Sequence, residues 1–134
     1  MVPQYELLEK FLQYKFKNPW LLVEALTHPS FMSNRVTQSY QRLEFLGDAI
    51  LDFLVTVTIY TEKSKEANTP GKLTDLRSAL VNNVTFGSLA VRYKFHNHVL
   101  YISKELQMCI DNFVSYQNKN KHEVTGHVCI SFHS

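Results

Sequence analysis

Apolar residues recur at spacings of three and four along most of the chain, which is the pattern of helices that bury one face. The pattern predicts helices over about residues 4–13, 19–27, 41–60, 73–81, 84–93 and 104–117. Side chains suited to cap helix N-termini precede three of them, namely Asn18, Asn83 and Ser103. In the first helix we expect a buried stripe made of Leu7, Leu8, Phe11 and Leu12. The expected fold class is therefore all-α.

The longest predicted helix covers residues 41–60. Its apolar positions keep the helical spacing from end to end: Leu43, Leu46, Ile50, Leu54 and Val57. The second half is rich in β-branched residues, but the unbroken stripe favours a helix over a strand. We expect this helix to be central and largely buried.

Composition narrows the class of protein. The chain has 134 residues, 45% of them hydrophobic, with only four glycines and four prolines, which suits one packed domain rich in long helices. The longest apolar stretch is too short and too polar for a membrane span, and the first residues do not resemble a signal peptide. Two cysteines form no disulfide framework, so we expect a cytoplasmic protein.

Charge gathers on the long helix. Residues 41–60 carry one arginine against three acids, whereas the segments on either side are weakly basic. Glu44, Asp48 and Asp52 are spaced by four, which places them along one helix face. Such a stripe is either an ordinary solvated face or a site for a hard cation such as Mg²⁺, which would relieve the repulsion between the carboxylates. Gly47, inside the helix, points to close approach of another backbone or a ligand.

Three runs of residues carry a family resemblance. They are residues 26–31 (LTHPSF), 40–52 (YQRLEFLGDAILD) and 70–83 (PGKLTDLRSALVNN). In their order and amino-acid sequence these motifs resemble the ribonuclease III family. The resemblance is strongest to the second nuclease domain of its Dicer-type members. The resemblance covers about residues 5–117, so we expect a partial ribonuclease III-like domain over 1–117 and an unmatched polar tail over 118–134.

The resemblance implies a Mg²⁺-dependent endonuclease, with Mn²⁺ as a substitute, that cuts double-stranded RNA in small-RNA processing. Glu44 and Asp48 match two of the four acids that hold metal in the family. Phe45 resembles a residue that joins two nuclease domains, although an ordinary core aromatic is the alternative. Asp52 matches no catalytic position, so we expect it to be part of a helix face or to form hydrogen bonds. Because each family domain contributes one active site, a second ribonuclease III domain is an expected partner.

The sequence departs from the family towards its end. No Asp-x-x-Glu pair follows residue 100, so the other two metal acids are missing, together with the helix that should cover the flank of the long helix. Asp111 resembles only a position before the missing motif. We therefore expect a truncated, alternatively spliced or mispredicted product. The alternative function is a catalytically incomplete fragment that pairs with another nuclease domain or binds duplex RNA.

Other candidates have weaker support. A zinc site could be assembled from the following residues, but their spacing resembles no known module: His96, His98, His122, His127, His133, Cys109 and Cys129. Lys119 and Lys121 are either phosphate contacts or part of a solvated tail. For Arg77, Asn82 and Asn83 we expect capping and hydrogen bonds at the edge of the core, with RNA contact as the alternative.

Overall fold

The computed structural model describes residues 3–31, 36–62 and 69–120. Its elements in chain order are α1 (Pro3–Leu12), α2 (Pro19–Ala25), α3 (Gln41–Thr61), α4 (Pro70–Leu80), α5 (Asn83–Arg92), the 3₁₀ helix η1 (Phe95–His98) and α6 (Lys104–Lys119). No strand forms among these residues, and the only β pairing is an isolated parallel bridge between Thr27 and Leu100. The all-α prediction is confirmed. None of the described helices is long and apolar enough to cross a membrane.

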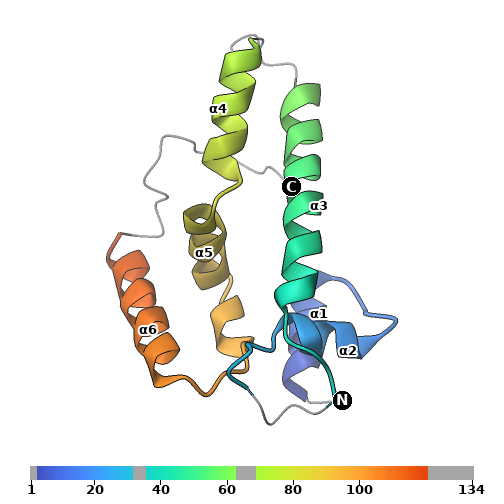
Figure 1. Ribbon diagram of the computed structural model, residues 1–134, viewed down its shortest axis with the longest axis vertical. Coiled ribbons are helices and arrows are strands. Elements are labelled where there is room, and N and C mark those ends of the chain that lie inside the picture. The colour runs from blue at the N-terminus through green and yellow to red at the C-terminus, as the bar shows by residue number, and fades with distance from the viewer. Residues whose placement is uncertain (1–2, 32–35, 63–68, 121–134) are drawn as a thin grey trace.

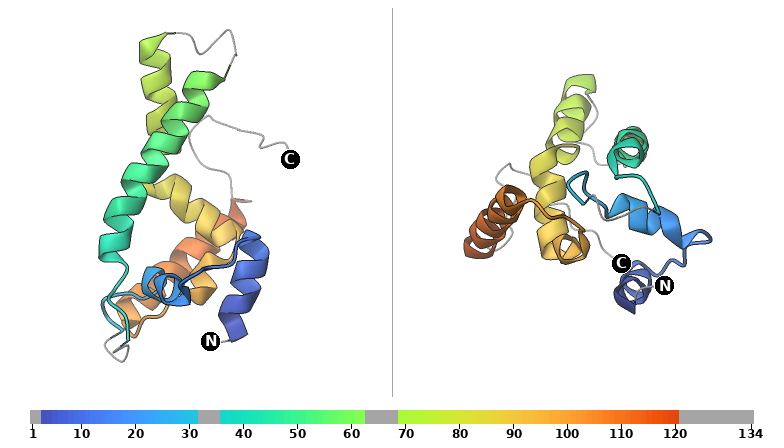
Figure 2. Two further views of the ribbon diagram at one scale, coloured as in Figure 1. Left: turned by 90° about the vertical axis from the view of Figure 1, so that its right-hand side faces the viewer. Right: turned by 60° about the horizontal axis from the view of Figure 1, so that its bottom comes forward.

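The helices form an open arrangement rather than a closed bundle (Figure 1). Helix α4 runs alongside α3, and α2 meets α3 near the beginning of α3. Helix α5 lies between α3 and α6, as both the front view and the tilted view show (Figure 2). Three of the five buried apolar residues of the described chain gather where α1, α2 and η1 meet. There Tyr5, Leu8 and Leu22 pack together, with Phe95 against them.

Local sequence signals explain where most helices begin. Asn18 accepts a hydrogen bond from the backbone N–H of Trp20, and Pro19 occupies the first turn of α2, where a missing N–H costs nothing. Thr69 and Ser103 cap α4 and α6 in the same way. The prediction that Asn83 caps α5 is wrong by one residue. Asn82 is the cap, because its extended backbone lets the side chain accept from the N–H of Thr85.

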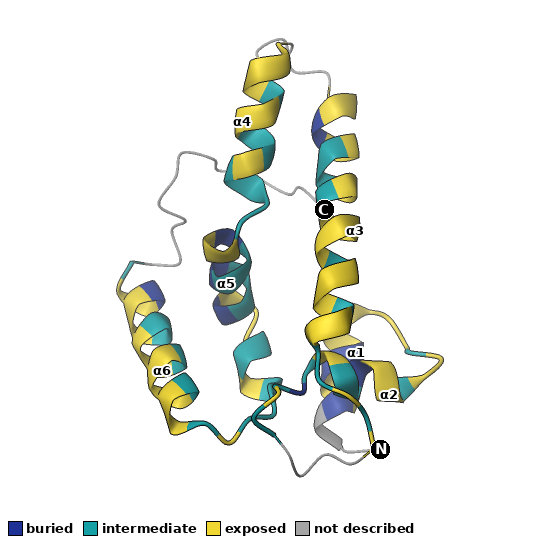
Figure 3. Cartoon of the chain, in the orientation of Figure 1, coloured by how far each residue is buried: buried dark blue, intermediate teal, exposed yellow. Residues whose placement is uncertain are grey.

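The prediction of a largely buried long helix is also wrong. Ile59 is the only buried residue of α3, and most of the helix is exposed (Figure 3). The large apolar side chains that face solvent are Phe45, Leu46, Ile50, Leu51, Phe53, Leu54, Val57 and Tyr60. The physical reason is that, among the described helices, only α4 and α2 make substantial contact with α3. Spacing shows which residues share a face, but not whether another element covers that face.

The stripe predicted for α1 is likewise only partly correct. Leu8 is buried as expected, but Leu7 is 65% exposed, and the second deeply buried apolar residue is Tyr5. Phe11 is half-exposed and lies against the rings of Tyr93 and Phe95, with centroids 5.7 and 5.8 Å away. The face of α1 that enters the core is therefore rotated from the predicted stripe.

Candidate active site

Glu44 and Asp48 lie on the first half of α3 with both side chains exposed. Their spacing of four puts the two carboxylates on one face of the helix. Glu44 is in the first turn, where the positive end of the helix dipole stabilises its negative charge. Burial, and secondarily the charge of Glu44, raise the pKa of Tyr40 above its ordinary value. The structure therefore presents the two predicted metal ligands together, at the surface.

Asp52 has a different environment from the other two acids. One further helical turn brings its carboxylate towards α4, where Oδ1 lies 3.7 Å from Nε of Arg77. The two side chains are 48% and 42% exposed, so this is a surface ion pair that links α3 to α4. Among the described residues Asp52 is therefore engaged in an exposed ion pair with α4 rather than in a hydrogen bond.

A metal ion at this face would be held by two carboxylates. Carboxylate oxygens are the ligands that hard divalent cations prefer, and Mg²⁺ is usually held by one or two carboxylates while it keeps several waters. Glu44 and Asp48 fit that requirement. Across the described parts of the chain, no group of three or more His, Cys, Asp or Glu side chains could form a larger cluster. Asp111 cannot join them, since it lies on α6, beyond α5, where it accepts a hydrogen bond from Gln107.

The beginning of α3 is anchored through the backbone. Tyr40 directly precedes the helix and donates its N–H to the carbonyl of Thr27 over 2.9 Å, while its own carbonyl accepts from the N–H of Glu44 over 2.8 Å. Its ring contacts the imidazole of His28, with centroids 5.8 Å apart. The chain segment that follows α2 therefore sets the position of the turn that carries Glu44.

The same segment is tied to the residues before α6 by a contact that we call the His28–Ser30 joint. The N–H of Ser30 donates to Nδ1 of His28 over 3.0 Å, so Nδ1 is the unprotonated ring nitrogen. The Ser30 hydroxyl, 2.9 Å from Nδ1, is then the donor in that contact. Its oxygen accepts from the N–H groups of Ile102 and Ser103 over 3.2 and 3.4 Å. Residues 26–31 drew attention as a motif that resembles the family, but nothing in the sequence alone indicated that Ser30 would connect this segment to the residues before α6.

Phe45 is 83% exposed, so it is not a core aromatic of the described part of the chain. Gly47 also faces open space, because a Cβ built on it would meet nothing within 4 Å. The close approach predicted for Gly47 does not occur within the residues described here. A close approach of this kind occurs instead at Gly87 of α5, where a Cβ would lie 3.2 Å from the ring of Phe113 on α6.

The remaining candidates are not assembled into a site. His96 lies near the carbonyl of Ala90, and Cys109 is exposed and free, so neither contributes to a metal cluster within the structure's described ranges. Asn82 caps α5, as its expected role required. Lys119 is exposed at the end of α6. His98 lies at the end of η1 and likewise joins no such cluster. Five further candidates lie outside the described residues, as does nearly all of the predicted tail: Lys121, His122, His127, Cys129 and His133.

Comparison with known proteins agrees with this arrangement. Residues 41–130 match the sequence profile of the ribonuclease III domain. The chain is 49% identical over 126 residues to endoribonuclease Dicer-S of Xenopus laevis, and 50% identical over 118 residues to endoribonuclease Dcr-1 of Drosophila melanogaster. These matches cover 94% and 88% of this chain but only 6% and 5% of the two relatives, so the chain spans a small part of their length.

Solved structures give the same result for the fold. A crystal structure of the nuclease domain of ribonuclease III from Campylobacter jejuni superposes with a TM-score of 0.64 at 34% identity, over 92% of this chain and 73% of that one. A second structure of that domain, with a TM-score of 0.63, has a flexible region involved in dimer formation. The profile match spans more than half of the chain and includes the helix with both acids. The chain belongs to the ribonuclease III family.

Proposed function

We propose that this chain is a nuclease domain that cleaves double-stranded RNA in small-RNA processing, with Mg²⁺, or Mn²⁺ in its place, held by Glu44 and Asp48. Ribonuclease III domains are metal-dependent nucleases that act on double-stranded RNA and form dimers. The observation that carries the proposal is the pair of exposed carboxylates on one face of α3, within the part of the chain that matches the family. One free cysteine, Cys109, suits the reducing cytoplasm, where we place the activity.

The exposure of the two acids suits this substrate. Duplex RNA is recognised by its shape and its phosphate and ribose groups, and it cannot enter a deep pocket. Glu44 and Asp48 project from a convex helix, so a phosphodiester backbone can approach them from solvent. The weakly basic flanks of the acidic segment favour the approach of a polyanion. When bound, the metal would supply charge stabilisation and activation of water. The two residues would hold it and fix its distance from the phosphate.

A second candidate function rests on the exposed apolar side of α3. Phe45, Phe53 and Tyr60 are 83%, 65% and 77% exposed, which is unusual for large side chains on one helix. Pairing with a second ribonuclease III domain would cover such residues, and Phe45 is our candidate for that contact. The chain would then act as a catalytically incomplete module for pairing or duplex binding, because only two of the four metal acids are present.

Cleavage of a labelled RNA duplex in Mg²⁺ tests the first function. We expect the chain to cut the duplex, chelation of the metal to stop it, and Glu44→Gln or Asp48→Asn to abolish it while far-UV circular dichroism is unchanged. Glu105→Gln is the matched control, since Glu105 is also an exposed acid in the first turn of a helix, α6. Loss of the charge of Glu44 at the helix start costs only about 0.3–1 kcal/mol. Asp48 is exposed, where substitutions usually change stability by no more than about 0.5 kcal/mol, so both variants should fold.

The outcome for the unaltered chain separates the two functions. No cleavage under any metal condition would refute independent nuclease activity. Size measurement with and without a second nuclease domain, together with a duplex mobility shift, then tests the pairing function. A chain that stays monomeric and binds no duplex would refute that function as well.

A further inference from the structure

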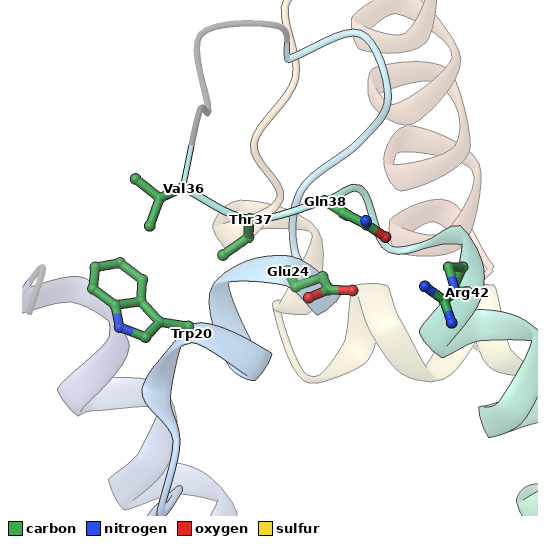
Figure 4. Close-up of a pocket in the computed structure, with 6 residues that line it drawn as sticks. All are labelled: Trp20, Glu24, Val36, Thr37, Gln38 and Arg42. Carbon is green, nitrogen blue, oxygen red and sulfur yellow. The ribbon is translucent and has the colours of Figure 1, made fainter.

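A surface hollow at the beginning of α3 has no assigned role. It lies between α2, residues 36–38 and the first turn of α3, and has a volume of about 700 Å³, within the range of small-molecule sites. Figure 4 shows the indole of Trp20 at one end, the guanidinium of Arg42 at the other, and the carboxylate of Glu24 between them. Arg42 precedes Glu44 by two residues, a spacing at which side chains do not share a helix face, so the hollow opens at the same end of α3 as the candidate metal ligands but on a different side of the helix.

The side chains of Trp20, Glu24 and Arg42 in the hollow are available to a ligand. Trp20 is 54% exposed, which is high for the largest side chain in proteins. Within the described residues the only ion pair is that between Arg77 and Asp52, so neither Arg42 nor Glu24 is engaged in one. Their side chains also form no hydrogen bond within the described part of the chain. The hollow therefore offers a stacking surface, a cation and a hydrogen-bond acceptor at the same time.

A nucleotide presents the matching set of groups. Exposed tryptophan stacks on nucleobases of any kind, and arginine pairs with phosphate. A carboxylate accepts from the exocyclic amino group of a base such as cytosine, whereas uracil has no such group. Glu24 is half-buried, and its carboxylate lies between the indole and the guanidinium, where the edge of a base stacked on Trp20 can meet it (Figure 4).

We propose that this hollow binds one unpaired nucleotide of an RNA strand. The base stacks on Trp20, Glu24 accepts from its amino group, and Arg42 pairs with its phosphate. The inference rests on the proposed function, because RNA is the ligand expected at the acidic face of the same helix. It goes beyond that function in giving the domain a preference for unpaired ends or bulges, and for amino-bearing bases, next to the duplex that is cut.

Trp20 supplies the probe for the test, because it is the only tryptophan of the chain. Intrinsic fluorescence is followed as single-stranded pentacytidylate or pentauridylate is added to the full chain in the absence of metal. We expect saturable quenching, with the cytidine strand bound more tightly. Glu24→Gln should remove the difference between the two strands. Arg42→Gln should weaken binding about tenfold. It should also reduce the slope of log Kd against log salt by about one, because one phosphate contact is lost.

Two controls make these effects specific to the hollow. Arg92→Gln removes an equally exposed arginine at the end of α5, and should leave quenching unchanged. Trp20→Ala is measured by filter binding instead of fluorescence, and should bind pentacytidylate about tenfold more weakly through loss of stacking. Circular dichroism of each variant verifies the fold.

Several results would overturn the inference. They are absence of saturable quenching, equal effects of Arg42→Gln and Arg92→Gln, and equal quenching by a blunt duplex. Quenching by an added second nuclease domain but not by RNA would also overturn it, and would make the hollow a protein contact. Duplex binding and cleavage are measured on the same preparation. If both persist while quenching is absent, the hollow proposal alone fails, whereas loss of duplex binding would remove the proposed function itself.

Discussion

Replacing Ser30 with alanine should weaken the connection between the beginning of α3 and the rest of the molecule. In the His28–Ser30 joint the hydroxyl takes part in three contacts, with His28 Nδ1 at 2.9 Å and with the N–H groups of Ile102 and Ser103 at 3.2 and 3.4 Å. The joint lies beside the backbone bonds of the bridge, in which His28 donates to Leu100 and Leu100 donates to the carbonyl of Leu26, over 2.9 and 2.7 Å. The side chain therefore reinforces a contact between residues 72 positions apart in sequence.

The magnitude follows from the geometry. A neutral hydrogen bond contributes about 0.5–1.5 kcal/mol net to stability. The two bonds from backbone N–H groups are long, and the group on Ile102 is exposed and can bond to water instead. We therefore expect Ser30→Ala to lower the free energy of unfolding by about 1.5 kcal/mol, near the lower end of the sum of three bonds. Ser30→Thr keeps the hydroxyl and should recover most of the loss.

Urea unfolding followed by circular dichroism measures the free energy, and amide hydrogen exchange measures the joint itself. The amides of Ile102 and Ser103 should exchange faster in Ser30→Ala. Ser115→Ala is the matched control, because Ser115 is exposed on α6; its substitution should change stability by no more than about 0.5 kcal/mol. The reasoning is refuted if the two alanine variants unfold alike and the exchange of those two amides stays the same.

Three further measurements test other parts of the structure. Gln117 is 1% exposed and its Oε1 has no hydrogen-bond partner, so Gln117→Leu should leave the free energy of unfolding unchanged or raise it, and a loss above about 1 kcal/mol in urea unfolding would contradict this. A double-mutant cycle on Arg77 and Asp52 should give a coupling of no more than about 0.5 kcal/mol, because the pair is exposed; a larger value would show that the surface pair is worth more than its geometry suggests. Glu44→Gln should lower the pKa of Tyr40 in a ¹³C NMR titration but leave it above 10.0, since burial is the larger cause of the raised pKa; no change would exclude the charge of Glu44 as a cause. Because the folded chain holds that phenolic proton more tightly than the unfolded chain, the contribution of Tyr40 to stability is complete below pH 10.0 and is lost as pH rises through the folded pKa.

Local sequence signals predicted the helices well because helix ends depend on neighbouring residues. The predicted long helix began at Gln41, as observed, and ended within one residue of the observed Thr61. Asn18 and Ser103 cap helices as predicted, since a side chain that accepts from an N–H two or three residues later needs no distant partner. Asn82 and Asn83 can both cap a helix. The extended backbone that makes Asn82 the cap cannot be predicted from the residue type alone.

Burial and the joint could not be predicted in the same way, because both depend on distant parts of the chain. The apolar spacing of α3 is that of a buried helix, yet Leu46, Ile50 and Leu54 face solvent, because no described helix packs over them. Ser30 meets Ile102 only after the chain has folded back on itself. The two carboxylates of the candidate site were predictable because they belong to one helix, whereas the hollow around Trp20 depends on three separate segments.

The open space around Gly47 connects these findings to function. Glycine inside a helix costs about 1 kcal/mol relative to alanine, and at most positions such a cost is offset by close packing. Gly87 illustrates this, since a Cβ there would lie only 3.2 Å from the ring of Phe113, which would have to shift. Nothing within the described residues lies close enough to Gly47 to require a glycine. Its neighbours in sequence are Asp48 and, two residues earlier, the exposed Phe45. A glycine between the proposed metal ligand and the proposed pairing residue fits a helix whose backbone is approached from outside, by a second nuclease domain or by the phosphates of the duplex that we propose it cuts.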